Sequence, residues 1–299
     1  NSYPSVETML TDNSIELIVV NTPNITHYQY AKMALLAGRH VIVEKPFAAT
    51  SAQAKELVQL AENQKRFLCV YQNRRWDSDF LTVKEVIEKK LLGELIETEI
   101  HYDRYRLELN DKKPHKEKPD TGVGNMYDLG PHLIDEAIVL FGKPDAVFAI
   151  IQSHRPNSLV DDYFEIKLLY PDFTCTLKSS LLVHEPQAGY ILHGVKGSFI
   201  KSRSDNQEAA LQKGISPCVP HWGEEPESDW GILSAEINGQ AVREKYPSIP
   251  GNYAKFYELV YHSIRNKEEP PLALRDSILN MQIIEAACQS GRNKEIVKL

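Results

Sequence analysis

Residues Ile15-Glu-Leu-Ile-Val-Val-Asn-Thr-Pro-Asn-Ile-Thr-His27 form an apolar run that ends in polar, turn-forming residues. A short run rich in isoleucine and valine predicts a buried β-strand, and the polar end predicts a turn into a helix that continues to about Leu36. Gly38 is expected to end this helix before a second strand at His40–Glu44. Buried strands that alternate with helices are typical of a parallel α/β sheet.

The next segments continue this alternation. Ser51–Asn63 has the period of a helix, and residues 67–71 predict a third strand that leads into polar residues 72–77. Ligands of doubly wound sheets bind beyond the carboxyl ends of the strands. We therefore expect residues 22–27, 44–46 and 72–77 to face one crevice.

Beyond Gly93 the pattern changes to strands. Residues 94–107 predict a long alternating strand, and an apolar helix is predicted from near Tyr127. Further strands are predicted at residues 146–153, 163–170, 174–182 and 190–201, helices at 252–266 and 275–290, and flexible covering loops at 112–119 and 215–230. This order predicts a partial Rossmann domain at residues 1–77 and an α+β domain with a large, mainly antiparallel open sheet at residues 78–299.

Composition excludes several classes of protein. The 299 residues carry a net charge of -7 and have no polybasic block, which argues against a nucleic-acid partner. The longest apolar runs are far shorter than the roughly twenty residues of a membrane-spanning helix, so no membrane partner is expected. Four scattered cysteines, without paired spacing, fit a reducing compartment. These features predict a soluble cytoplasmic protein.

One motif carries an acid and a base. Asp128 and His132 lie four residues apart at the start of the apolar run near Tyr127, so a continuous helix would place them on one face. A carboxylate that fixes one imidazole nitrogen leaves the other free to act as a general base. Taken alone, however, such a pair is more often a surface pair without a catalytic role.

A second motif is Glu44-Lys45-Pro46, at the predicted end of a strand. A lysine held at the mouth of a parallel sheet can stabilise a developing alkoxide. The alternative interpretation is a solvated surface lysine, which is the commoner situation. His27 could equally be an ordinary residue of a first helical turn, and the pair Arg74-Arg75 either an anion site or simply exposed.

Together, four stretches of the chain resemble the glucose-fructose oxidoreductase and inositol dehydrogenase (Gfo/Idh/MocA) family. They occur in the family's order and are Asn21-Thr-Pro-Asn-Ile-Thr-His27, Ala37-Gly-Arg-His-Val-Ile-Val-Glu-Lys-Pro-Phe47, Asn73-Arg-Arg-Trp-Asp-Ser-Asp-Phe-Leu-Thr82 and Tyr127-Asp-Leu-Gly-Pro-His-Leu-Ile-Asp135. The resemblance covers nearly the whole chain. Residues 73–77 and 193–201 are most similar to the branch that contains bacterial NADP-dependent scyllo-inositol dehydrogenases.

The resemblance implies an NAD(P)-dependent dehydrogenase that acts on a sugar or polyol, with NADP favoured over NAD by the branch. It implies catalytic roles for Lys45, Asp128 and His132, which would also contact the substrate together with Asn73. The implied cofactor-binding residues are Thr22, Pro23, Asn24, His27, Glu44, Lys45 and Arg74. No metal is implied, and Cys218-x-x-His221 lacks the second pair of ligands that a zinc site needs.

One feature of the family is missing from these residues. Its members open with a Gly-x-Gly-x-x-Gly turn that binds the cofactor pyrophosphate, and the 299 residues contain no such turn. We therefore expect the first β-α-β unit to lie outside this sequence, and weak binding of NAD(P)H by the 299 residues alone. The alternative hypothesis is a non-catalytic sensor or scaffold of the same fold. A homodimer or homotetramer, formed through an uncovered sheet face, is also expected.

Overall fold

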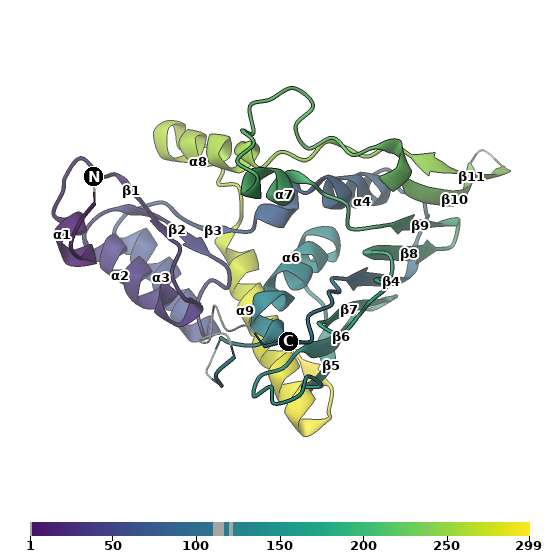
Figure 1. Cartoon of the computed structure of the whole chain (residues 1–299), viewed down its shortest axis with the longest axis horizontal. Helices are drawn as coiled ribbons and strands as arrows, with labels where there is room; N and C mark the ends of the chain where they lie inside the picture. Colours follow the sequence, from purple (N-terminus) through teal and green to yellow (C-terminus); the bar gives the residue numbers. More distant parts are fainter. Residues whose placement is uncertain (1, 110–116, 120–121, 238) are drawn as a thin grey trace.

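A computed structural model describes residues 2–109, 117–119, 122–237 and 239–299. In these residues the chain forms two sheets (Figure 1), one of three strands and one of nine. The predicted α/β class, with a partial Rossmann sheet and a larger, mainly antiparallel sheet, is confirmed. No helix among the described residues has the length and apolar character needed to cross a membrane.

The smaller sheet is entirely parallel and has the strand order β1-β2-β3. Its strands are β1 (Leu17–Val20), β2 (His40–Glu44) and β3 (Leu68–Tyr71), and the helices beside them are α1 (Val6–Leu10), α2 (His27–Leu36) and α3 (Ser51–Asn63). Thr50 caps α3 because its side chain accepts a hydrogen bond from the Gln53 amide. The apolar runs that predicted the strands supply buried side chains such as Val41, Val43 and Val70.

The larger sheet has the order β11-β10-β9-β8-β4-β7-β6-β5-β12, and β4 with β7 is its parallel pair. Its strands are β4 (Leu95–His101), β5 (Ala146–Gln152), β6 (Tyr163–Leu169), β7 (Thr174–Ser180), β8 (Tyr190–Gly194), β9 (Gly197–Lys201), β10 (Gly231–Ile237), β11 (Gln240–Tyr246) and β12 (Val297–Lys298). The strand predicted at residues 94–107 ends earlier, at His101. The strand predicted at 190–201 is a hairpin that turns at Val195 and Lys196.

Helices separate the two sheets. The remaining α-helices are α4 (Ser78–Glu88), α5 (Asn125–Asp128), α6 (Gly130–Phe141), α7 (Gln207–Gln212), α8 (Ala254–Asn266) and α9 (Leu274–Asn293), and the 3-10 turns are η1 (Asn24–Thr26), η2 (Asn73–Trp76) and η4 (Glu227–Asp229). Helix α9 contacts α3 and β3 on one side and β5 on the other, so one apolar core runs through both parts. Figure 1 shows α4, α6 and α9 on a single face of the larger sheet, with no helix of the described chain on the other face.

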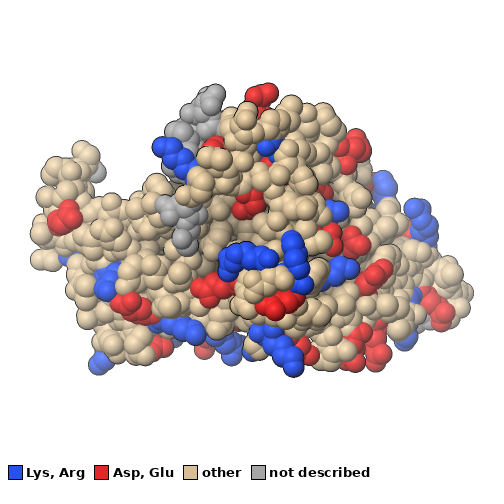
Figure 2. All heavy atoms as spheres, turned by 90° about the horizontal axis from the view of Figure 1, so that it is seen from below, with Lys and Arg blue, Asp and Glu red and all other residues tan. Residues whose placement is uncertain are grey.

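Charge is evenly spread over the face of the molecule that Figure 2 shows. Acidic and basic side chains are interspersed there, and no extended field of one sign covers this face. Of the two predicted covering loops, residues 215–230 contain η4. The other falls largely outside the described residues, apart from Glu117, Lys118 and Pro119.

Candidate active site

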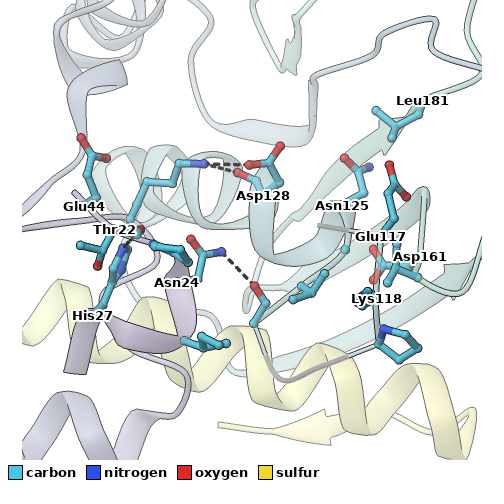
Figure 3. A pocket seen from close by; sticks show the side chains of 18 of the residues that line it. Thr22, Asn24, His27, Glu44, Glu117, Lys118, Asn125, Asp128, Asp161 and Leu181 are labelled. Atoms are coloured by element: carbon cyan, nitrogen blue, oxygen red, sulfur yellow. Dashed lines mark hydrogen bonds and ion pairs between the residues drawn. The ribbon is translucent and has the colours of Figure 1, made fainter. Parts of the chain in front are cut away.

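A cavity of about 660 Å³ lies where the carboxyl ends of β1 and β2 meet α5 and the segment after β4. Figure 3 shows Thr22, Asn24 and His27 on one side of it and Asn125, Glu117 and Asp161 on the other. The residues that line it and concern the chemistry are Thr22, Pro23, Asn24, His27, Glu44, Lys45, Arg104, Arg106, Glu117, Asn125, Asp128, Arg155 and Asp161. The cavity therefore occupies the position expected for a ligand of a parallel sheet.

Lys45 and Asp128 are brought together across the cavity from 83 positions apart in the chain. The Lys45 Nζ donates to the Asp128 carbonyl oxygen at 2.6 Å and lies 3.4 Å from the carboxylate Oδ1. The lysine side chain is 18% exposed, so it is not the solvated surface lysine of the alternative interpretation. Its ammonium is fixed because Lys45 follows β2 directly and because two oxygen atoms of Asp128 bind the Nζ.

The expected hydrogen bond between Asp128 and His132 is not present, although the structure describes both residues. Asp128 ends α5, and His132 belongs to α6, which begins again after a bend at Leu129. Pro131 has no amide hydrogen to continue the first helix, so the two side chains do not lie on one uninterrupted helical face. The Asp128 carboxylate faces Lys45 instead, and His132 Nδ1 is buried without a hydrogen-bond partner.

His132 is buried in a strongly cationic environment. Burial is the main cause that holds the pKa of this imidazole well below its usual range, and the charges of Lys45, Arg74, Arg203 and Arg104 lower it further. A histidine in this environment is neutral at physiological pH and can therefore accept a proton. His132 is not among the residues that line the cavity, although it lies close enough to Lys45 for that charge to lower its pKa.

The loop after β1 is connected to both halves of the cavity. Asn24 Nδ2 donates to the Gly122 carbonyl at 2.9 Å, which joins the loop to the chain before α5. The His27 ring lies between two carbonyl oxygens, that of Pro46 at 2.7 Å from Nδ1 and that of Thr22 at 2.9 Å from Nε2. Burial lowers the pKa of His27, and a neutral ring can donate to only one of these carbonyls. His27 thus holds the ends of β1 and β2 side by side.

Residues after β3 are placed differently from those after β1 and β2. Neither Asn73 nor Arg74 is among the residues that line the cavity. Arg74 pairs with Asp77 at 3.0 Å and Glu208 at 3.1 Å, and its guanidinium lies over the Tyr102 ring. The crevice expected from three strand ends is therefore built from two of them, while η2 directs Arg74 toward α7.

Several cavity residues were not selected from the sequence. Asn125 donates to Ser179 Oγ at 3.0 Å, and Asp161 accepts from the Met126 amide at 2.6 Å. Burial raises the pKa of Asp161 to about 6, and burial also raises the pKa of Glu44. Arg104 and Arg106 follow β4 within the predicted strand 94–107. Their alternate spacing in an extended segment is the signal that could have placed both on one side of the chain.

Comparison with known proteins places this geometry in a family. Residues 1–72 match the profile described as "Oxidoreductase family, NAD-binding Rossmann fold", and residues 84–299 match "Oxidoreductase family, C-terminal alpha/beta domain". The chain belongs to the Gfo/Idh/MocA oxidoreductase family. It is therefore an NAD(P)-binding oxidoreductase, and the resemblance expected from the four sequence stretches is confirmed.

Relatives within the Gfo/Idh/MocA family match over most of the chain. The Escherichia coli oxidoreductase YdgJ is 38% identical over 96% of this chain and 82% of its own length. The Bacillus subtilis scyllo-inositol 2-dehydrogenase (NADP(+)) IolW is 36% identical over 98% of this chain and 82% of its own. The crystal structure of an oxidoreductase from Bacillus cereus superposes with a TM-score of 0.90 at 34% identity, over 99% of this chain and 84% of that one.

The cavity fits the reactive end of the nicotinamide cofactor that the family implies. Thr22, Pro23 and Asn24 form its wall at the carboxyl end of β1, where dinucleotides bind in this type of sheet. Hydroxyl and amide side chains beside a proline can form hydrogen bonds with the carboxamide group of a flat nicotinamide ring, and they supply no positive charge for a phosphate. Gly-x-Gly-x-x-Gly does not occur in these residues, so the fit concerns the nicotinamide end.

Proposed function

We propose that the protein transfers a hydride between a nicotinamide cofactor and a secondary hydroxyl group of a sugar or polyol. The observation that carries this proposal is the Lys45–Asp128 contact at the cavity wall, with the neutral His132 beside it. A non-catalytic scaffold has no need of a fixed ammonium at a cavity wall with a buried neutral imidazole near that ammonium. The similarity to a scyllo-inositol dehydrogenase supports a polyol as substrate and NADP as the preferred cofactor.

The nicotinamide cofactor supplies the hydride acceptor when it is bound, held by Thr22, Pro23 and Asn24. The chain itself manages the proton and the charge of the substrate oxygen. Lys45 donates a hydrogen bond to the hydroxyl oxygen and stabilises negative charge as it develops there. His132 accepts the proton at Nε2, because Nδ1 is enclosed by protein.

Asp128 has a different role from the one expected from sequence. Its carboxylate and carbonyl oxygens hold the Lys45 ammonium in place rather than orienting the imidazole. Lys45 therefore acts as a hydrogen-bond donor, and the proton from the substrate is left to His132.

The proposal is tested on the native protein with the phosphate-binding turn that the family implies. Reduced nicotinamide formed from a panel of inositols, hexoses and sugar acids is measured with NADP⁺ and with NAD⁺. We expect turnover of at least one polyol, and a higher kcat/KM with NADP⁺ than with NAD⁺. Binding of polyols without any oxidation, under conditions where the cofactor is shown to bind, would support the scaffold hypothesis instead.

A further inference from the structure

Two arginines of the cavity differ from the other arginines around it. Arg104 and Arg106 lie in an extended segment whose amides donate to the carbonyl oxygens of Ser180 at 2.9 Å and Leu181 at 2.7 Å. Both side chains line the cavity, whereas the intervening Tyr105 stacks on His184 with ring centroids 3.5 Å apart. The period of two in an extended chain thus directs a pair of guanidinium groups to the same place.

Neighbouring arginines already have carboxylate partners. The ion pairs are Arg74 with Asp77, Arg75 with Asp135, Arg155 with Glu117 and Asp162, and Arg203 with Glu136. Neither Arg104 nor Arg106 forms an ion pair with any carboxylate in the part of the chain that the structure describes. Arg104 Nη2 contacts the Tyr102 hydroxyl at 3.3 Å, and its guanidinium lies 4.9 Å from the centroid of that ring.

The acidic residues of the cavity do not offset these two charges. Glu117 is 3.0 Å from Arg155, and Asp128 is bound to Lys45. The remaining carboxyl groups, Glu44 and Asp161, are partly buried, and among the described residues neither forms an ion pair with Arg104 or Arg106. Positive charge is therefore left over on the side of the cavity formed by the segment after β4.

We propose that Arg104 and Arg106 bind an anionic group of the substrate, so that the polyol carries a carboxylate or a phosphate. This inference rests on the proposed dehydrogenase function, and it restricts the proposed substrates to anionic polyols. Planar guanidinium groups suit the oxygens of either anion, because each can donate two parallel hydrogen bonds. The reacting hydroxyl would lie at Lys45 and the anion at the arginine pair.

An anion at this position also affects the base. Arg104 is one of the cations that hold the pKa of His132 low. Neutralising its charge would raise the pKa of His132 and make the imidazole a stronger base when the correct substrate is bound. A neutral polyol would leave the base weak, so substrate charge would influence kcat as well as KM.

The test uses the same native protein and compares D-glucose, D-glucuronate and D-glucose 6-phosphate by calorimetric titration and by turnover with NADP⁺ and NAD⁺. We expect the affinity and the kcat/KM of the anionic compounds to be about ten- to hundredfold higher than those of glucose. The reason is that a hydrogen bond to a charged group stabilises a complex more than a hydrogen bond between neutral groups. Arg104→Gln should remove most of this preference, and Arg104→Lys should keep part of it. Arg243→Gln, an exposed arginine of β11, is the control and should leave the preference unchanged.

The binding and turnover measurements together separate the possible outcomes. Anion binding that depends on Arg104, without oxidation of any compound, would support the anion site and contradict the dehydrogenase proposal. Oxidation of glucose as efficient as that of both anions, and unaffected by Arg104→Gln, would overturn the anion site alone. Equal or undetectable binding of all three compounds would also overturn it. The preference between glucuronate and glucose 6-phosphate decides whether the anion is a carboxylate or a phosphate.

Discussion

The Lys45 ammonium lies 2.6 Å from the carbonyl oxygen of Asp128 and 3.4 Å from its carboxylate. A lysine with two acceptors on one residue has little freedom to move, so its charge is in place before a substrate arrives. This preorganisation is what transition-state stabilisation requires, since no group must be reoriented during the reaction.

The first prediction concerns this lysine. Lys45→Gln should lower kcat/KM for the oxidised polyol by about a hundred- to a thousandfold, the usual effect of losing one donor to a developing oxyanion. Thermal unfolding should show that the variant remains folded. Lys55→Gln, an exposed lysine of α3, serves as the control. Equal activity of the two variants would remove Lys45 from the mechanism.

The second prediction concerns Gly124, which precedes α5. Its φ of +98° and ψ of 172° strongly favour glycine, and a Cβ there would meet Asp161 Oδ1 at 2.0 Å. Gly142, with φ of +77° and ψ of -155°, has the same kind of backbone but no heavy atom within 4 Å of a Cβ. Gly142→Ala should lower the free energy of unfolding by about 1–3 kcal/mol. Gly124→Ala should cost about 1–3 kcal/mol more through overpacking, as measured by denaturant titration.

The third prediction concerns pH and stability. The pKa of His132 is well below 6.5 in the folded protein, because burial and neighbouring cations disfavour its charged form. The unfolded chain therefore binds a proton that the native protein does not, so stability from His132 is present above about pH 6.5 and is lost as the pH falls. In His132→Gln, the free energy of unfolding should fall less steeply below pH 6.5, by at most about 1.4 kcal/mol per pH unit. An unchanged slope, from denaturant titrations at several pH values, would contradict a buried neutral imidazole.

The fourth prediction concerns assembly. The face of the larger sheet opposite α4, α6 and α9 carries no helix of the described chain (Figure 1), and Ile200 of β9 is 44% exposed. An uncovered sheet face of this kind is commonly paired with a second copy of the same chain. Light scattering at micromolar concentration should give at least twice the 34.0 kDa of one chain. A monomeric mass would contradict this expectation.

Sequence was most informative where burial alone decides the structure. The apolar runs of β2 and β3 could be recognised because successive residues of both strands are buried, as in most parallel sheets. The hairpin of β10 and β11 was not predicted, since most residues of β11 are exposed and show no alternation of apolar and polar residues. The turn at Val195 and Lys196 was missed, although Gly194 and Gly197 on its two sides are a signal that could have located it.

Site residues were harder to predict because contacts between distant segments decide their roles. Lys45 and Asp128 could each be selected from a local motif, but their direct contact could not. The interruption between α5 and α6 depends on Pro131, which the four-residue spacing of Asp128 and His132 disregards. Arg104 differs from neighbouring arginines in forming no ion pair with a described carboxylate. This difference could not be predicted, because ion pairs between distant residues form only in the folded chain.

The central claim is that His132 is the base in a hydride transfer, and the most direct measurement is the turnover of His132→Ala set against its cofactor affinity. We predict that kcat falls by about a hundred- to ten-thousandfold, while the dissociation constant of the nucleotide changes by no more than about twofold, because a general base acts in the transition state. His154→Ala, an exposed histidine, should retain full activity. Near-normal turnover by His132→Ala would contradict the account and leave Lys45 as the group that handles the proton.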